Sequence, residues 1–307
     1  MKRYLVKMLP LVHLCVWVSA CLLLAAGPSQ AVLIDGFSSD SNDRFANSSS
    51  FTADGYDLSG VALSNDSKWL TMVSPNVYLS ANHFKPGIGA SVTFYGSNDP
   101  LGGSVVRTVT NNRERILSSD LWIGTLDSPL PSGYGYYSFA TEDITTGTGN
   151  GQGSFNASPY AGENAFIFGR SPNNFAISKD MSVGRNRLDL WWDVVSVKGT
   201  VDSAIGSLVD ESDDPNYVQH EAYLQPGDSG GPMFVDIGGN LRLVGINWFI
   251  DDDPASDFNG QSYVGNYDGV IQEFIEANPI PEPSAQALLA SALLLAACGT
   301  RSRPSRM

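Results

Sequence analysis

The chain has 307 residues, with 32 Asp or Glu against 18 Lys or Arg, so its formal net charge at pH 7 is −14. All 32 acidic residues but only 12 of the basic ones lie between residues 32 and 284, which argues against binding to nucleic acid or to an anionic membrane surface. The three cysteines, Cys15, Cys21 and Cys298, lie near the ends. A domain over 32–284 is therefore held together by packing alone, and roughly 250 residues are enough to bury such a core.

The first 31 residues are predicted to be an export signal. Three basic residues within positions 1–7 precede an apolar stretch, and residues 29–31 (Ser-Gln-Ala) place small side chains where a signal peptidase cleaves. We expect cleavage after Ala31. Residues 18–21 (Val-Ser-Ala-Cys) resemble a bacterial lipobox, which would make Cys21 a lipidated N-terminus. The apolar run continues beyond this cysteine, which favours the first alternative.

The middle of the chain has the pattern of an all-β protein. Residues 32–55 are rich in Ser, Asn and Asp and are predicted to be a flexible lead-in. Short apolar runs separated by Gly, Pro, Asn and Asp then predict strands of a sandwich or barrel. The expected strands of the first half, about 56–146, are 69–73, 77–81, 90–95, 104–110 and 121–126.

A glycine-rich break at 147–153 is predicted to link this half to a second one, about 154–278. The second half includes strands at 165–169 and 188–198, and a hairpin over 232–249 that turns at Gly238-Gly239-Asn240. Apolar residues at helical spacing predict a helix over 268–278.

Residues 227–232 read Gly-Asp-Ser-Gly-Gly-Pro, a pattern that suits a nucleophile. Glycines on both sides of Ser229 permit a sharp turn that exposes the hydroxyl and directs backbone N–H groups at a developing oxyanion. A serine nucleophile usually needs a histidine base, and the chain has only His13, His83 and His220. The same residues fit the G-x-S-x-G turn of α/β-hydrolases, but that fold places its histidine after the serine, where this chain has none.

Two further segments supply the partners that such a serine needs. His83 ends the run Tyr-Leu-Ser-Ala-Asn-His at 78–83, and Asp120 opens the apolar run 120–126. The order His, Asp, Ser is that of the trypsin-like type. On these three motifs the chain resembles the trypsin-like (chymotrypsin-fold) serine peptidase family. Other carboxylates near Asp120 are Asp99 and Asp127, and His220 is expected to be a partly exposed loop residue.

The resemblance implies a fold of two six-stranded antiparallel β-barrels with a short C-terminal helix, spanning residues 56–278. It implies a serine endopeptidase in which His83 is the base, Asp120 orients it, and the N–H groups of Gly227 and Ser229 form the oxyanion hole, without a cofactor or a metal. Tyr223, six residues before the serine, would form the floor of the substrate pocket. An acidic floor selects Arg or Lys, so we expect a preference for small or apolar side chains.

Two alternatives remain at this point. A catalytically silent member of the same fold would act as a surface or matrix binding module. The acidic runs at 210–214 and 251–253 invite a calcium site, but their spacing matches no calcium-binding loop and favours solvated loops.

The C-terminal residues 279–307 are predicted to be a sorting segment. Residues 281–284 (Pro-Glu-Pro-Ser) precede an apolar stretch at 285–298 and then three arginines, which resembles the PEP-CTERM signal that an exosortase processes in Gram-negative bacteria. A marginal tail anchor or a hydrophobic terminal helix is the alternative. We therefore expect an exported protein of the cell surface, outer envelope or extracellular matrix. Its partners would be a protein or peptide substrate and an exosortase-type enzyme, with transient membrane contact through this segment.

Overall fold

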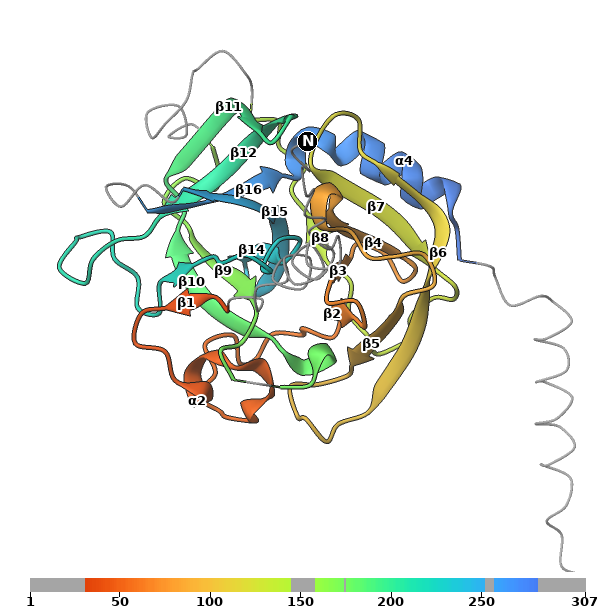
Figure 1. Ribbon diagram of the computed structural model, residues 1–307, viewed down its shortest axis with the longest axis horizontal. Coiled ribbons are helices and arrows are strands. Elements are labelled where there is room, and N and C mark those ends of the chain that lie inside the picture. The colour runs from red at the N-terminus through yellow and green to blue at the C-terminus, as the bar shows by residue number, and fades with distance from the viewer. Residues whose placement is uncertain (1–30, 145–157, 174, 252–256, 281–307) are drawn as a thin grey trace, which may run out of the picture.

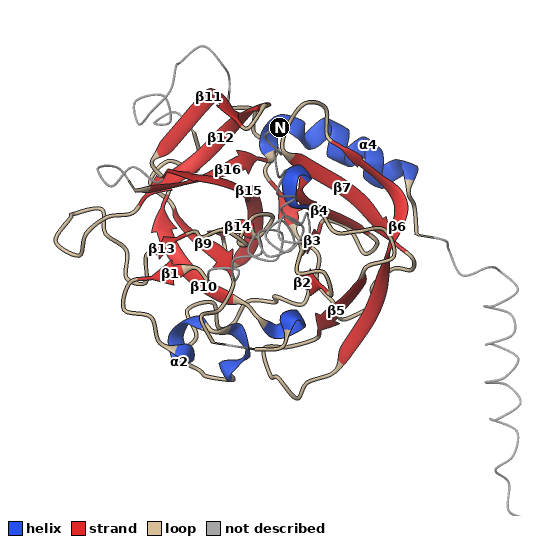
Figure 2. Ribbon diagram, viewed as in Figure 1, coloured by secondary structure: helices blue, strands red, loops and turns tan. Residues whose placement is uncertain are grey.

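The protein is seen here in a computed structural model, which describes residues 31–144, 158–173, 175–251 and 257–280. Two β-structures lie side by side, one built from β2 to β7 and the other mainly from β9 to β16 (Figure 1). Strands dominate, and the longest helix within the described residues, α4 (Asp268–Ala277), lies along the outside beside β7 (Figure 2). The expected all-β class and short C-terminal helix are confirmed.

The first β-structure is a closed barrel of six antiparallel strands in the order β2-β3-β4-β7-β6-β5. These strands are β2 (Val61–Ser64), β3 (Trp69–Met72), β4 (Val77–Ala81), β5 (Ser91–Tyr95), β6 (Ser104–Arg115) and β7 (Leu121–Leu126). Every residue of β2, β3 and β4 is buried. Because side chains alternate across a strand, Leu70 packs with the barrel's own Val92 and Phe94, whereas Trp69 packs toward the second sheet.

The second β-structure is a sheet in the order β10-β9-β14-β15-β16-β12-β11, with β8 pairing β15 outside this path. Its strands are β8 (Ser138–Phe139), β9 (Asn164–Gly169), β10 (Ser182–Arg187), β11 (Leu190–Val197), β12 (Thr200–Leu208), β14 (Pro232–Ile237), β15 (Asn240–Asp251) and β16 (Phe258–Tyr263). A separate pair joins β1 (Leu33–Ile34) to β13 (Ala222–Tyr223). The expected hairpin is present as β14 and β15, and Gly238 and Gly239 supply the positive φ angles of its turn.

The segment 32–55 corrects one prediction, because it is packed rather than a flexible lead-in. It forms β1, α2 (Ser39–Asn42) and the 3₁₀ helix η1 (Arg44–Ala46). The guanidinium of Arg44, 1% exposed, donates to the Val61 carbonyl oxygen at 3.0 Å and to that of Tyr95 at 3.3 Å. Asn42 Nδ2 donates to Val183 O in the second sheet at 3.0 Å. The polar side chains that suggested a loop thus form buried hydrogen bonds that connect the two β-structures.

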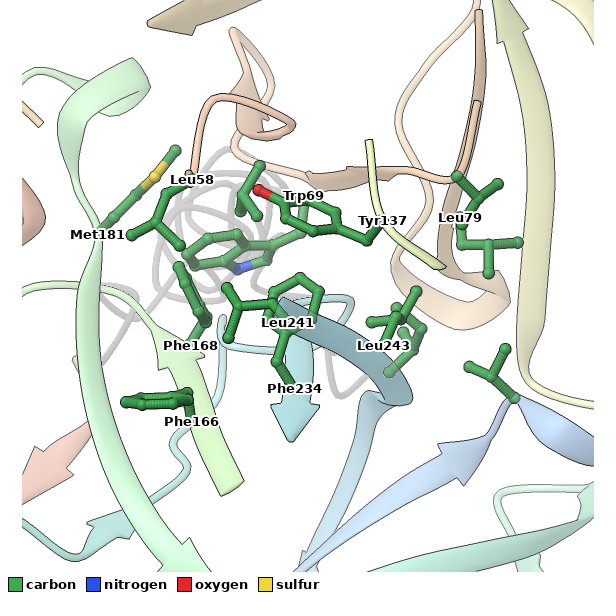
Figure 3. Packing of buried hydrophobic residues seen from close by; sticks show 14 of the residues in the cluster. Leu58, Trp69, Leu79, Tyr137, Phe166, Phe168, Met181, Phe234, Leu241 and Leu243 are labelled. Carbon is green, nitrogen blue, oxygen red and sulfur yellow. The ribbon is translucent and has the colours of Figure 1, made fainter. Parts of the chain in front are cut away.

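A large apolar cluster fills the boundary between the two β-structures (Figure 3). Trp69 of β3 meets Phe168 of β9 edge to face with ring centroids 6.4 Å apart, and Phe168 meets Phe234 of β14 at 5.7 Å. Leu241 and Leu243 of β15 point into the same cluster. Burial of these side chains fixes the end of β4 relative to the start of β14, and the candidate site lies between those two points.

Several predictions lie outside the described residues: the export signal up to residue 30, the glycine-rich link at 147–153, and the sorting segment from residue 281. Among the helices that the structure describes, none is long and apolar enough to cross a membrane.

Candidate active site

His83 and Asp120 are brought together by the pairing of β4 with β7. Ala81 at the end of β4 pairs with Leu121 at the start of β7, so the residues just beyond these ends are neighbours. His83 lies in the 3₁₀ helix η2 (Asn82–Phe84) that follows β4. Its Nδ1 lies 2.5 Å from Asp120 Oδ2, and its backbone N–H donates to Asp120 Oδ1 at 3.1 Å. The Asp120 side chain is 1% exposed and that of His83 is 39% exposed. A buried carboxylate therefore orients the imidazole, and the rest of the ring remains accessible to solvent.

A second buried carboxylate holds Asp120 in place. Asp202 Oδ2 accepts hydrogen bonds from the Asp120 backbone N–H at 3.0 Å and from Ser262 Oγ at 2.7 Å. Asp202 Oδ1 accepts from the Ser203 N–H at 2.8 Å and from the Tyr267 hydroxyl. Burial raises the pKa of Asp202, while these hydrogen bonds favour its ionised form. The second sheet and the start of α4 therefore both contribute to the position of a residue in the first barrel.

Ser229 lies in a tight turn just before β14. Gly227 and Gly230 have φ angles of +112° and +89°, which side chains rarely adopt. The Gly230 N–H donates to the Asn247 carbonyl oxygen at 2.9 Å, and the Asn247 N–H donates to Gly231 O at 2.8 Å, so β15 holds the turn. A Cβ on Gly230 would meet Ser80 Oγ of β4 at 3.2 Å. This close approach carries Ser229 to the end of β4, where His83 begins its own turn.

Ser229 and His83 line one cavity of about 360 Å³. Its lining is mainly apolar and consists of His83, Phe84, Val197, Lys198, Thr200, Leu224, Gln225, Pro226, Gly227, Ser229, Asn247, Trp248, Phe249 and Ile250. Among the described residues, the backbone N–H groups of Gly227 and Ser229 have no hydrogen-bond acceptor, and no hydrogen bond joins Ser229 Oγ to His83. Two free N–H groups beside a half-buried hydroxyl form an arrangement suited to an oxyanion.

Asp228 is fully buried behind the turn. Its carboxylate accepts hydrogen bonds from the N–H groups of Arg170 at 2.6 Å and Gln225 at 2.7 Å. Burial raises the pKa of Asp228 to about 8. The side chain of Val32 lies near Asp228, because both pack against Gly169. A Cβ added to Gly169 would lie 2.6 Å from Val32 Cβ and 2.9 Å from Asp228 Cγ. The first residue after the expected signal cleavage therefore lies beside this carboxylate.

The structure thus brings His83, Asp120, Ser229 and Gly227 to one place, whereas Tyr223 lies differently from the expectation. The lining of the cavity includes the next residue, Leu224, and not Tyr223. The Tyr223 hydroxyl donates to Asp251 O at 2.5 Å. β13 ends at Tyr223, and the residue that follows it, Leu224, is the one that lines the cavity.

The other candidates from the sequence lie elsewhere. Asp99 accepts from the Leu101 N–H in a turn at 2.8 Å, and Asp127 accepts from the Thr108 N–H at 3.0 Å. His220 does not line the cavity, and its backbone oxygen accepts from Arg185 N at 2.8 Å. Within the part of the chain that the structure describes, no group of three or more His, Cys, Asp or Glu side chains is placed to hold a metal ion.

Sequence reasoning missed Asp202 and left Asn247 without a role. Asn247 Nδ2 donates to Phe168 O at 2.8 Å and to Asp228 O at 3.1 Å, which fixes the turn that carries the serine. The run 244–248 signalled a strand beside the site, but no pattern in the sequence marks Asp202. A scan against family models finds no match for the chain, and a search of curated proteins finds no relative.

Proposed function

We propose that this protein is an exported serine endopeptidase of the trypsin-like type, with Ser229 as nucleophile, His83 as base and Asp120 as the residue that orients His83. One observation carries the proposal: the His83–Asp120 contact lies at a cavity that Ser229 also lines, beside two unpaired N–H groups. The order of these residues in the chain, and the motifs around them, support the same assignment.

In the first half of the reaction, Ser229 Oγ attacks the carbonyl carbon of the scissile peptide bond while its proton passes to His83 Nε2. The Asp120 carboxylate on Nδ1 keeps Nε2 free to accept that proton and stabilises the imidazolium that results. The negative charge on the tetrahedral oxygen is received by the N–H groups of Gly227 and Ser229.

In the second half, the imidazolium returns its proton to the leaving amine as the C–N bond breaks, which leaves an ester on Ser229. A water molecule then attacks the ester carbonyl as His83 takes its proton. The second tetrahedral species collapses as the imidazolium returns that proton to Ser229 Oγ, which releases the carboxylic acid and restores the serine. The residues already named supply every proton transfer.

The proposal includes a second barrel. The run β10-β9-β14-β15-β16-β12 contains six strands, and closure would join β10 to β12. One contact supports such a closure: Asn186 of β10 donates from Nδ2 to Leu208 O of β12 at 3.2 Å. The Oδ1 of the same side chain accepts from the N–H of Ala222 in β13 at 3.1 Å. In this arrangement β11 is an additional strand that extends β12 beside the cavity.

Apolar side chains are the expected residues at the cleavage site. Leu224, Trp248, Phe249 and Ile250 line the cavity, and the described lining includes a lysine but no Asp or Glu. A cationic substrate side chain would therefore find no acidic partner among these lining residues. We expect cleavage after small or apolar residues rather than after Arg or Lys. This preference is the one first inferred from Tyr223, now assigned to other residues.

Export completes the proposal. The signal over 1–31 would deliver the protein across the inner membrane, and the PEP-CTERM-like segment over 279–307 would hand it to an exosortase for display at the cell surface or in the extracellular matrix. Intact-mass measurement of the protein recovered from the envelope tests this: a mass lacking both ends supports it, and an unprocessed chain in the cytoplasm contradicts it.

Peptide hydrolysis with matched histidine variants tests the enzymatic proposal. Ser229→Ala and His83→Asn are expected to lower kcat/KM for a Leu-containing peptide by at least about a thousandfold. The matched control is His220→Asn, because asparagine tolerates the positive φ of 69° at this position and the residue lies outside the cavity. It should retain activity within about twofold. A folded wild-type protein that cleaves nothing would favour the binding-module alternative.

A further inference from the structure

The mouth of the cavity is basic, although the protein is strongly acidic. Lys198 lines the cavity directly. Arg115 donates from Nη2 to Thr200 Oγ1 at 3.2 Å, and Thr200 is also a lining residue. Lys85, two residues after His83, donates from Nζ to Asn82 O at 3.0 Å. Together with Arg113, these residues are here called the basic rim.

Two charges of the basic rim lie beside the same aromatic ring. Lys85 Nζ lies 4.3 Å from the centre of the Trp122 ring, and the guanidinium of Arg113 lies 5.5 Å from it. Burial lowers the pKa of Lys85, and Arg113 and Arg115 lower it further, while Asp120 raises it.

Carboxylates do not neutralise the basic rim within the described part of the chain. None of its four side chains forms a salt bridge there. The nearest catalytic carboxylate, Asp120, is buried and already contacts His83. Glu114 lies between Arg113 and Arg115 in β6, so strand alternation directs its side chain to the opposite face. Of the basic rim, Lys198 lines the cavity and Arg115 donates to a lining residue, and neither forms a salt bridge with a described carboxylate.

From this arrangement we infer that the site takes acidic polypeptides, in which Asp or Glu residues flank the apolar residue at the cleavage site. The inference rests on the proposed peptidase function and names its substrate class. Charges farther away than about 8 Å are largely screened at physiological ionic strength. Lys198, on the wall of the cavity, lies within this range of a bound segment. The apolar lining would hold the central side chain, and the rim would pair with its acidic neighbours.

Binding to an inactive form tests the inference without turnover. The full chain carrying Ser229→Ala is titrated, by fluorescence anisotropy in 0.15 M NaCl, into two labelled peptides that share a central Leu. One peptide has Glu at the flanking positions and the other has Gln. We expect the Glu peptide to bind about fivefold to twentyfold more tightly, from several partly exposed ion pairs acting together. Because salt screens these pairs, the ratio should fall toward one in 1 M NaCl.

Charge-removing substitutions identify the residues responsible. Lys198→Gln and Arg115→Gln should each lower the Glu-to-Gln affinity ratio about twofold to fourfold. Arg107→Gln is the matched control, because Arg107 lies in the same strand eight residues from Arg115, about 25 Å away. It should leave the ratio unchanged.

The outcomes separate this inference from the proposed function. Equal affinity for the two peptides, or an equal effect of Arg107→Gln and Lys198→Gln, overturns the acidic-substrate inference. Cleavage of both peptides at equal rates by the unsubstituted protein also overturns it and leaves the peptidase function standing. Selective binding of the Glu peptide by a protein that cleaves neither supports the charge preference and overturns the peptidase function.

Discussion

Asp202 offers a test of how the second sheet positions the proposed catalytic residues of the barrel. Asp202→Ala removes the acceptor of four hydrogen bonds, one of them from the Asp120 backbone N–H. The Ser262 and Tyr267 hydroxyls can turn to other acceptors, whereas the two backbone N–H groups cannot. Each buried group left unpaired costs about 1–3 kcal/mol. The free energy of unfolding should therefore fall by about 2–6 kcal/mol.

Activity should fall with it, because Asp120 loses a fixed position. A displacement of catalytic groups by about 1 Å costs about a hundredfold in rate, so kcat should fall about tenfold to a hundredfold, with KM changed much less. Ser262→Ala is the control: it removes one of the four hydrogen bonds but leaves the carboxylate on Asp120, and kcat should stay within about threefold of the wild type. Urea unfolding and steady-state kinetics supply both readouts. Wild-type kcat in a folded Asp202→Ala variant would refute the positioning role.

Three further predictions concern the turn, the buried carboxylate and the cavity. Gly230→Ala should destabilise the protein by about 1–3 kcal/mol, because φ is +89° and Ser80 Oγ lies 3.2 Å from the added Cβ; unchanged urea unfolding would contradict this. The raised pKa of Asp228, about 8, means that the folded state holds a proton that the unfolded state releases near pH 4. Stability should therefore fall from pH 5 to 8, by at most about 1.4 kcal/mol per pH unit, in a protein with residues retained before Val32. In a protein that starts at Val32, the α-ammonium, whose nitrogen donates to Arg170 O at 3.1 Å, would favour the ionised form of Asp228 and reduce this slope, and equal slopes in the two proteins would argue against such an interaction. Finally, peptides with Leu or Ala before the scissile bond should exceed an Arg peptide in kcat/KM by at least about tenfold. Faster cleavage after Arg would show that the cavity does not select for apolar side chains.

The local pattern of the sequence was enough to predict most of the elements. The runs 69–73, 77–81 and 121–126 correspond to β3, β4 and β7 with boundaries within one residue. A short apolar run with turn residues at both ends is compatible with few secondary structures other than a buried strand. The prediction of a flexible lead-in over 32–55 was wrong because polar composition indicates only the average tendency of a segment to be exposed to solvent. It does not report that Asn42 and Arg44 find buried backbone acceptors more than a dozen residues away.

The candidate site divides in the same way. Ser229 and His83 are carried by turns whose glycines and neighbours are visible in the sequence, whereas Asp202 acts through a partner 82 residues away. No local pattern marks such a contact, since it depends on how the second sheet packs on the barrel. The count of six residues before the serine pointed to Tyr223, and the cavity lining includes its neighbour Leu224.

Labelling with a fluorophosphonate tests the central proposal most directly, since this reagent bonds only to an activated serine. We expect one adduct per molecule, mapped by mass spectrometry to Ser229. Labelling should be lost in Ser229→Ala and His83→Asn and kept in His220→Asn. A folded protein that begins at Val32 and remains unlabelled, or a label that persists in His83→Asn, would contradict the assignment of Ser229 and His83 as a catalytic pair.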